Sequence, residues 1–168
     1  MLSNFKGIIM NKKTVTAAIA AALLAAPAAF AEENTPEWLF VHDGDAMEIT
    51  DAGAIVVPVE REIFAFTDRP HRKHGYLNAH EFVSMWGDSE GSFRADPPNA
   101  VLTWVEDGEV QELEVELQNA RVADNGRMIH YEFVTEDGKA NARSVTDAAL
   151  YIDGCSNRCA MYMYSSLL

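Results

Sequence analysis

The sequence predicts an all-β fold, a mainly antiparallel β-sandwich or flattened barrel, with one short helix. Two observations favour this class. Apolar and polar side chains alternate with a period of two over several short segments, and dipeptides typical of tight hairpin turns separate these segments. About eight short strands are expected along the chain.

The clearest strand pattern lies at residues 112–117, where three glutamates alternate with Leu113, Val115 and Leu117. This pattern predicts a strand with one solvated face and one buried face. Residues 129–133 alternate in the same way around Tyr131. Weaker strand patterns cover residues 38–42, 46–50, 54–59, 63–67, 100–105 and 149–153.

Glycine dipeptides mark the predicted turns. Asp-Gly and Asn-Gly supply the positive φ angles that two-residue hairpin turns require. Short turns join antiparallel neighbours, so residues 99–134 are expected to form an antiparallel meander. The four dipeptides are Asp43-Gly44, Asp107-Gly108, Asn125-Gly126 and Asp137-Gly138.

One helix is expected after Asn78. Asn78 followed by Glu81 is the pattern of a capping box, and apolar residues follow it directly. The helix should end at Gly87. Residues 87–98 contain Gly, Ser, Asp and two prolines, which predicts a loop, and Phe93 is expected to anchor it.

Residues 1–31 have the pattern of a cleavable signal peptide. Lys12 and Lys13 precede an apolar Ala/Leu run at residues 15–26, and small residues stand at Ala29 and Ala31. The run is shorter than the roughly 20 residues that a membrane span needs. We therefore expect a mature single domain at residues 32–168 that is exported to the periplasm or the extracellular space, without stable membrane insertion after cleavage.

The charge balance narrows the classes of partner. The chain has 26 acidic and 13 basic residues, a formal net charge of −13. Loss of the leader, which carries three basic and no acidic residues, makes the charge −16. This excess disfavours nucleic acid and leaves a small ligand or an envelope protein as the expected partner.

Residues 67–75 reverse this charge locally, because five basic or imidazole side chains lie in this one stretch. The planar forks of Arg69 and Arg72 suit a phosphate or carboxylate ligand, and Asp68 and His74 complete the predicted ligand-binding set. A structural alternative is a loop tied to Asp68 and to acids on neighbouring strands. A hydrolase-type alternative gives Asp68 an acid/base role with His71 or His74.

The same region carries a resemblance. The pattern TDRPxRxxG, WG, F and PPNA, within residues 62–105, resembles a family of small exported bacterial proteins of unknown function. The resemblance implies only that the loop, the helix and the Pro-Pro-Asn-Ala corner form one unit, and it implies no activity, cofactor or catalytic residue. The residues that carry it are Phe66 to Pro70, Arg72, Gly75, Phe82, Trp86, Gly87, Phe93 and Pro97 to Ala100.

The C-terminal tail holds the chain's two cysteines, Cys155 and Cys159. In an oxidising compartment these two are expected to form a disulfide. The alternative is a copper site, because two thiolates followed by the thioethers of Met161 and Met163 are ligands that select copper(I).

Together these features predict a non-enzymatic exported protein that acts as a binding or envelope-associated accessory domain. Arg69 and Arg72 are its expected contact residues, and no cofactor is expected. A periplasmic copper-binding protein is the second hypothesis, and a hydrolase-type enzyme at residues 68–74 is the third.

Overall fold

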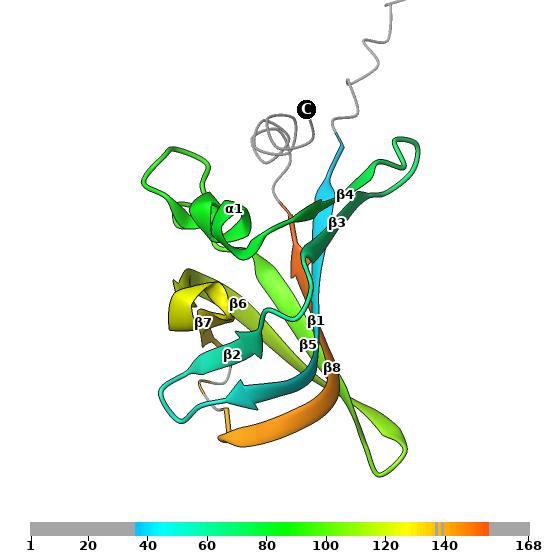
Figure 1. Cartoon of the computed structure of the whole chain (residues 1–168), viewed down its shortest axis with the longest axis vertical. Coiled ribbons are helices and arrows are strands. Elements are labelled where there is room, and N and C mark those ends of the chain that lie inside the picture. Colours follow the sequence, from blue (N-terminus) through cyan, green and yellow to red (C-terminus); the bar gives the residue numbers. More distant parts are fainter. Residues whose placement is uncertain (1–35, 137, 139, 155–168) are drawn as a thin grey trace, which may run out of the picture. The chain divides into compact units, whose positions relative to one another are not determined.

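The computed structural model describes residues 36–136, 138 and 140–154. Along these residues the strands are β1 (Trp38–Ile49), β2 (Ala54–Pro58), β3 (Ile63–Thr67), β4 (His74–Leu77), β5 (Asn99–Glu106), β6 (Glu109–Ala123), β7 (Met128–Val134) and β8 (Arg143–Asp153). The helix α1 spans Ala79–Val83, and two 3₁₀ helices, η1 and η2, span Ser84–Trp86 and Asp124–Gly126 (Figure 1).

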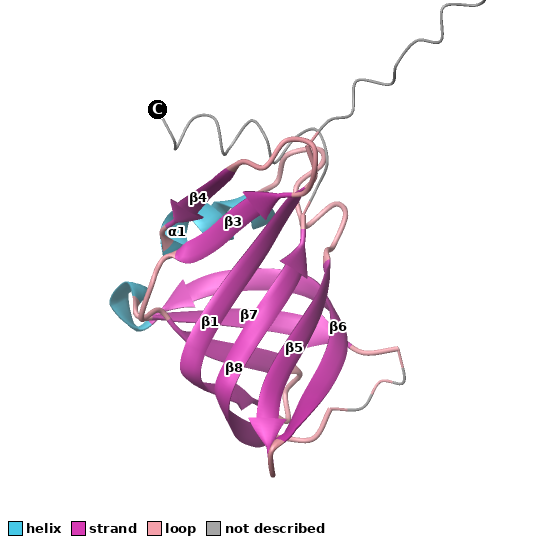
Figure 2. Cartoon of the chain, turned by 90° about the vertical axis from the view of Figure 1, so that its right-hand side faces the viewer, coloured by secondary structure: helices cyan, strands magenta, loops and turns pink. Residues whose placement is uncertain are grey.

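Six strands close into a barrel, which confirms the predicted antiparallel all-β class. Neighbouring strands are antiparallel throughout the order β2-β7-β6-β5-β8-β1. The end of β1 pairs with β2, where Glu48 faces Val56 and Ile49 faces Ile55, and this pairing closes the barrel. β3 pairs with the first part of β1 and β4 extends β3, so the β3–β4 hairpin projects beyond the barrel (Figure 2).

Strand alternation fills the interior with large apolar side chains. Fully buried ones include Trp38, Phe40 and Tyr131. The helical segment adds Phe82, whose ring centroid lies 5.1 Å from that of Phe40 and 6.4 Å from that of Tyr131. These contacts make the helix and the barrel parts of one core.

The predicted helix start and loop anchor are confirmed. The Asn78 side-chain oxygen accepts a hydrogen bond from the Glu81 backbone N–H at 3.0 Å, and a Glu81 carboxylate oxygen accepts from the Asn78 N–H at 2.9 Å. The helical segment ends at Gly87. The Phe93 N–H donates to the Met85 carbonyl at 2.9 Å, and its buried ring holds the loop against the core.

Two of the predicted turn dipeptides lie between paired antiparallel strands, one is wrong, and one is only partly described. Asp107 and Gly108 have φ angles of 54° and 79° in the tight turn between β5 and β6, and Asn125-Gly126 lies in η2 between β6 and β7. Gly138 has a positive φ, but Asp137 lies outside the described residues, so the predicted turn at Asp137-Gly138 stays a prediction. Asp43-Gly44, however, lies inside β1, because both residues pair with β8, opposite Ala149 and Ala148.

The expectation that residues 67–75 form only a loop is also wrong at its end. His74 begins β4, which pairs with β3. Within the described residues, no helix is long and apolar enough to cross a membrane.

Candidate functional site

The predicted ligand loop is the tip of the β3–β4 hairpin. The buried Thr67 holds its base: the Thr67 N–H donates to the Lys73 carbonyl at 2.9 Å, and the Lys73 N–H donates to Thr67 Oγ1 at 2.9 Å. The Arg72 N–H donates to the Asp68 carbonyl at 3.0 Å, and Arg72 has a φ of 50°. The hairpin therefore presents Asp68, Arg69 and Arg72 to solvent in a hydrogen-bonded turn.

The structure places the four predicted ligand residues on one hairpin but in two environments. Asp68, Arg69 and Arg72 are exposed at the tip and form no ion pair with another described residue. Whether the loop is a ligand site or a structural loop tied to acids stays a prediction. His74 lies on β4, with its ring centroid 6.5 Å from that of Phe64. His74 therefore belongs to an aromatic surface rather than to the charged tip.

The aromatic surface beside His74 continues as a row of apolar side chains along the outer face of the eight-stranded sheet. The strand register aligns Tyr76 with Phe64, Phe64 with Val41, Val41 with Tyr151 and Tyr151 with Val101. All five side chains point away from the core, because they alternate with buried neighbours on their strands. We call this row, which crosses β4, β3, β1, β8 and β5, the outer stripe.

On β3 and β4, the half-buried Phe64 ring packs against neighbouring rings on the same face. The Phe64 ring centroid lies 5.3 Å from that of Tyr76 and 5.6 Å from that of Phe66. Tyr76 is 57% exposed and Tyr151 is 48% exposed. An open groove of about 580 Å³ runs over these side chains, and the ion-paired Arg61 and Asp43 (3.4 Å) and Glu62 lie along its rim.

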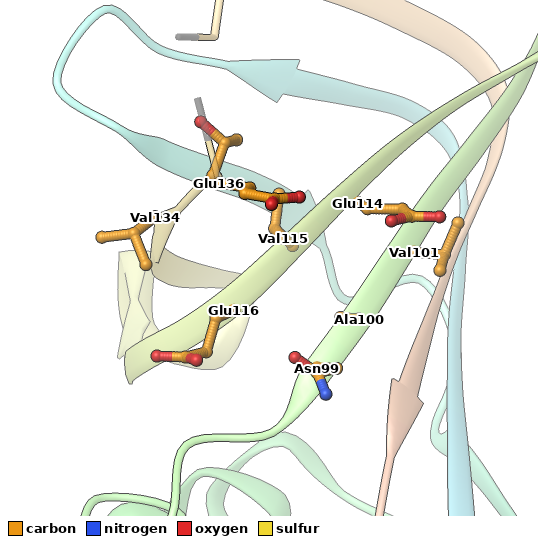
Figure 3. Close-up of a pocket in the computed structure, with 9 residues that line it drawn as sticks. Asn99, Ala100, Val101, Glu114, Val115, Glu116, Val134 and Glu136 are labelled. Carbon is orange, nitrogen blue, oxygen red and sulfur yellow. The ribbon is translucent and has the colours of Figure 1, made fainter. Parts of the chain in front are cut away.

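A second groove adjoins the outer stripe at Val101. It has a volume of about 530 Å³ and lies over β5, β6 and the end of β7. Figure 3 shows Glu114 beside Val101, with Glu116, Val134 and Glu136 also on the groove wall. None of these three glutamates forms an ion pair with a described residue. We call this feature the acidic groove.

Among the described residues, a pair of polar side chains lies in the barrel interior. His42 Nδ1 and the Tyr131 hydroxyl lie 2.9 Å apart. Burial lowers the pKa of His42 from 6.5 to about 4, and the nearby Pro58 carbonyl and Asp43 charge oppose this shift only in part. Burial also raises the pKa of Tyr131. His42 Nε2 has no hydrogen-bond partner within the described residues.

The predicted tail site lies outside the described residues. Cys155, Cys159, Met161 and Met163 all follow Gly154, where the described part of the chain ends. Among the described residues, no group of three or more His, Cys, Asp or Glu side chains is arranged to hold a metal ion. The disulfide and the copper alternative both stay predictions.

The outer stripe was missed in the sequence, although β3 carries a signal for it. Residues 63–67 read Ile-Phe-Ala-Phe-Thr, so both faces of this strand are apolar. A strand with one face in the core and an apolar second face predicts an exposed apolar surface. The contributions of Val41, Tyr151 and Val101 depend on strand register, which the sequence does not state.

Comparison with known proteins assigns no relative. No protein-family profile, curated protein or solved structure matches the chain, so the resemblance of residues 62–105 to small exported bacterial proteins stays a prediction.

Proposed function

We propose that this chain is an exported, non-enzymatic binding domain, and that the outer stripe is its binding face. The observation that carries the proposal is the alignment of five apolar side chains in one row on the solvent side of the barrel. Contiguous exposed apolar surface is costly in water and is typical of interaction sites. Tyrosine, which supplies two of the five side chains, is also enriched at protein interfaces.

The packing of the interior supports an outer binding face. Many small barrels hold a ligand inside, in a cavity reached from one end. Here aromatic side chains occupy the interior, and Phe40, Phe82 and Tyr131 are completely buried. The Trp86 and Phe93 rings pack at 4.7 Å beside them. A partner is therefore expected to bind the outer surface.

The hairpin tip extends this face. The Phe66–His74 pair lies two residues nearer the hairpin tip than the Phe64–Tyr76 pair. The exposed Arg69 and Arg72 follow at the tip itself. Arginine guanidinium groups make strong hydrogen bonds to carboxylates. In this proposal the outer stripe supplies apolar contact, and the two arginines supply polar contacts at one side of it.

Export and tail chemistry belong to the same proposal. Cleavage after Ala31 leaves Glu32 as the first residue, and the exported tail forms the Cys155–Cys159 disulfide. Intact-mass measurement of protein from the native host tests both. The expected mass is that of residues 32–168 less two hydrogen atoms, which are lost when the disulfide forms. A mass that includes copper, with both thiols reduced, would favour the copper site.

Site-specific photo-crosslinking tests the binding face. We would introduce p-benzoylphenylalanine at Tyr76 or at Tyr151 in the native host and identify the adducts by mass spectrometry. The control position is Val110, which is 73% exposed on β6 away from the outer stripe. We expect adducts with the same partner from Tyr76 and Tyr151 and none of that partner from Val110.

A second substitution makes the crosslinking result specific. Phe64→Ser removes the central ring of the stripe but leaves Tyr151 in place. We expect it to reduce the adduct yield from Tyr151 by about tenfold, in the range of a lost interface anchor. Adducts that appear equally from Val110, or that persist unchanged with Phe64→Ser, would show that the outer stripe is not the binding face.

A further inference from the structure

We infer that the partner of the outer stripe is an extended, cationic polypeptide segment, whose apolar side chains lie on the stripe and whose basic end lies in the acidic groove. This inference rests on the proposed binding function and names the chemistry of the partner. It is carried by the continuity of the two surfaces, by their charge and by their length.

The two surfaces form one path. Val101 pairs with Tyr151 on one side, as the last member of the outer stripe, and with Glu114 on the other. Val101 and Glu114 both line the acidic groove. The groove also has an apolar wall, because Val134 is 49% exposed there. A bound segment that follows the stripe across β8 and β5 therefore enters the groove directly.

The charges along this path favour a cationic segment and orient it. Glu114, Glu116 and Glu136 all line one end of the path, and none of them forms an ion pair with a described residue. Lysine or arginine side chains placed there are attracted by three carboxylates. Near the other end, Arg69 and Arg72 project from the hairpin that carries Tyr76. Asp68 and Glu62 also lie near that end and offset part of the arginine charge, so a basic end is attracted more strongly over β6 than over the hairpin.

The length of the path sets the length of the segment. Neighbouring strands are spaced about 4.8 Å apart, so the row from β4 to β6 spans about 24 Å. An extended chain covers this span with about seven residues. The segment crosses the strands, and its contacts are therefore side-chain contacts rather than backbone pairing.

A binding assay with two defined peptides tests this inference. The first probe is fluorescein-labelled Leu-Ser-Tyr-Ser-Leu-Ser-Lys-Lys-Lys, and the second has three glutamates in place of the lysines. Fluorescence anisotropy would be measured with the mature protein at low ionic strength. We expect the lysine probe to bind at least tenfold more tightly than the glutamate probe, and salt to weaken its binding.

Matched variants locate the charge effect. Glu114→Gln/Glu116→Gln keeps the shape of the groove and removes two charges, and it should weaken the lysine probe about threefold to tenfold. Glu60→Gln/Glu109→Gln removes the same charge at exposed positions outside the groove and should change binding less than twofold. Equal effects of the two double variants would overturn the inference in favour of a general charge effect.

The outcomes also separate this inference from the proposed function. Equal affinity for the lysine and glutamate probes overturns the cationic partner. If photo-crosslinking from Tyr151 still identifies a partner in that case, the binding face stands and only its partner chemistry is wrong. If Tyr151→Ser leaves the affinity of the lysine probe unchanged, the segment does not lie on the outer stripe.

Discussion

His42 shows how one residue couples the barrel interior to pH. It lies on β1, is 1% exposed and shares a hydrogen bond with the equally buried Tyr131. The pair is a side-chain hydrogen bond within a largely apolar interior, where an unpaired polar group costs about 1 to 3 kcal/mol. The lowered pKa of His42 follows from this burial, since a charged imidazole loses its hydration inside the barrel.

The pH dependence of stability should therefore contain a contribution from His42. Above pH 6.5 the ring is neutral in both the folded and the unfolded chain. Between pH 6.5 and about 4 the unfolded chain binds the proton and the folded chain does not, so acid lowers the free energy of unfolding. The 2.5-unit difference corresponds to about 3 kcal/mol, lost progressively over this window.

Urea unfolding of wild type and His42→Gln from pH 7 to 4 measures this contribution. The carboxylates titrate in both proteins, so the difference between the two curves isolates His42. We expect His42→Gln to be less stable at pH 7 and to lose about 3 kcal/mol less than wild type on going to pH 4. His80→Gln removes an exposed imidazole and should follow the wild-type curve, and parallel curves for wild type and His42→Gln would contradict the prediction.

At the scale of elements, the period-two patterns and the capping box were sufficient to predict most of the fold. The β6 pattern holds because Leu113, Val115 and Leu117 lie on the inner face. The helix start holds because Asn78 and Glu81 satisfy backbone groups locally, without help from distant residues. Features that depend on local chemistry were therefore accessible to sequence analysis.

Features that depend on pairing between strands far apart in the sequence could not be predicted from the sequence. Asp43-Gly44 has the same residues as the Asp107-Gly108 turn, yet β8 lies beside it and holds it in a strand. His74 and Tyr76 lie in a strand because β3 pairs with them, although the preceding Pro and Arg residues favour a turn. The outer stripe has the same origin, since five strands must align before its side chains form a row.

The dipeptides Asp43-Gly44 and Asp107-Gly108 provide a matched test of this difference. Gly108 has a φ of 79°, so Gly108→Ala places a side chain in a strained conformation and should lower the free energy of unfolding by about 1 kcal/mol. At Gly44 an added Cβ would lie 3.6 Å from Met47 Cε, an ordinary contact, so Gly44→Ala should change stability by less than about 0.5 kcal/mol. Guanidinium unfolding measures both, and a larger loss for Gly44→Ala than for Gly108→Ala would contradict the assignment of Asp43-Gly44 to a strand.

At the scale of the whole molecule, the barrel separates stability from binding. Inner residues, together with the helical segment, form one core, whereas the outer stripe remains open to solvent. Strand alternation produces this division, because successive side chains along a strand point to opposite faces of the sheet. The apolar residues of β3 and β8 therefore have two roles. Those on the inner face pack in the core, and those on the outer face remain available for a partner.

This division predicts opposite effects for two aromatic truncations. Phe82 is completely buried between the helical segment and the barrel, with its ring 5.1 Å from Phe40 and 5.5 Å from Trp86, so Phe82→Ala should lower the free energy of unfolding by about 3 to 5 kcal/mol. Tyr76 is 57% exposed, so Tyr76→Ala should cost less than about 1 kcal/mol while weakening partner binding. Urea unfolding followed by tryptophan fluorescence and by far-ultraviolet circular dichroism should give one coincident transition for each variant. Separate fluorescence and circular dichroism transitions would show that the helical segment and the barrel unfold independently. If Tyr76→Ala lowered the free energy of unfolding as much as Phe82→Ala does, the outer stripe would be a structural element.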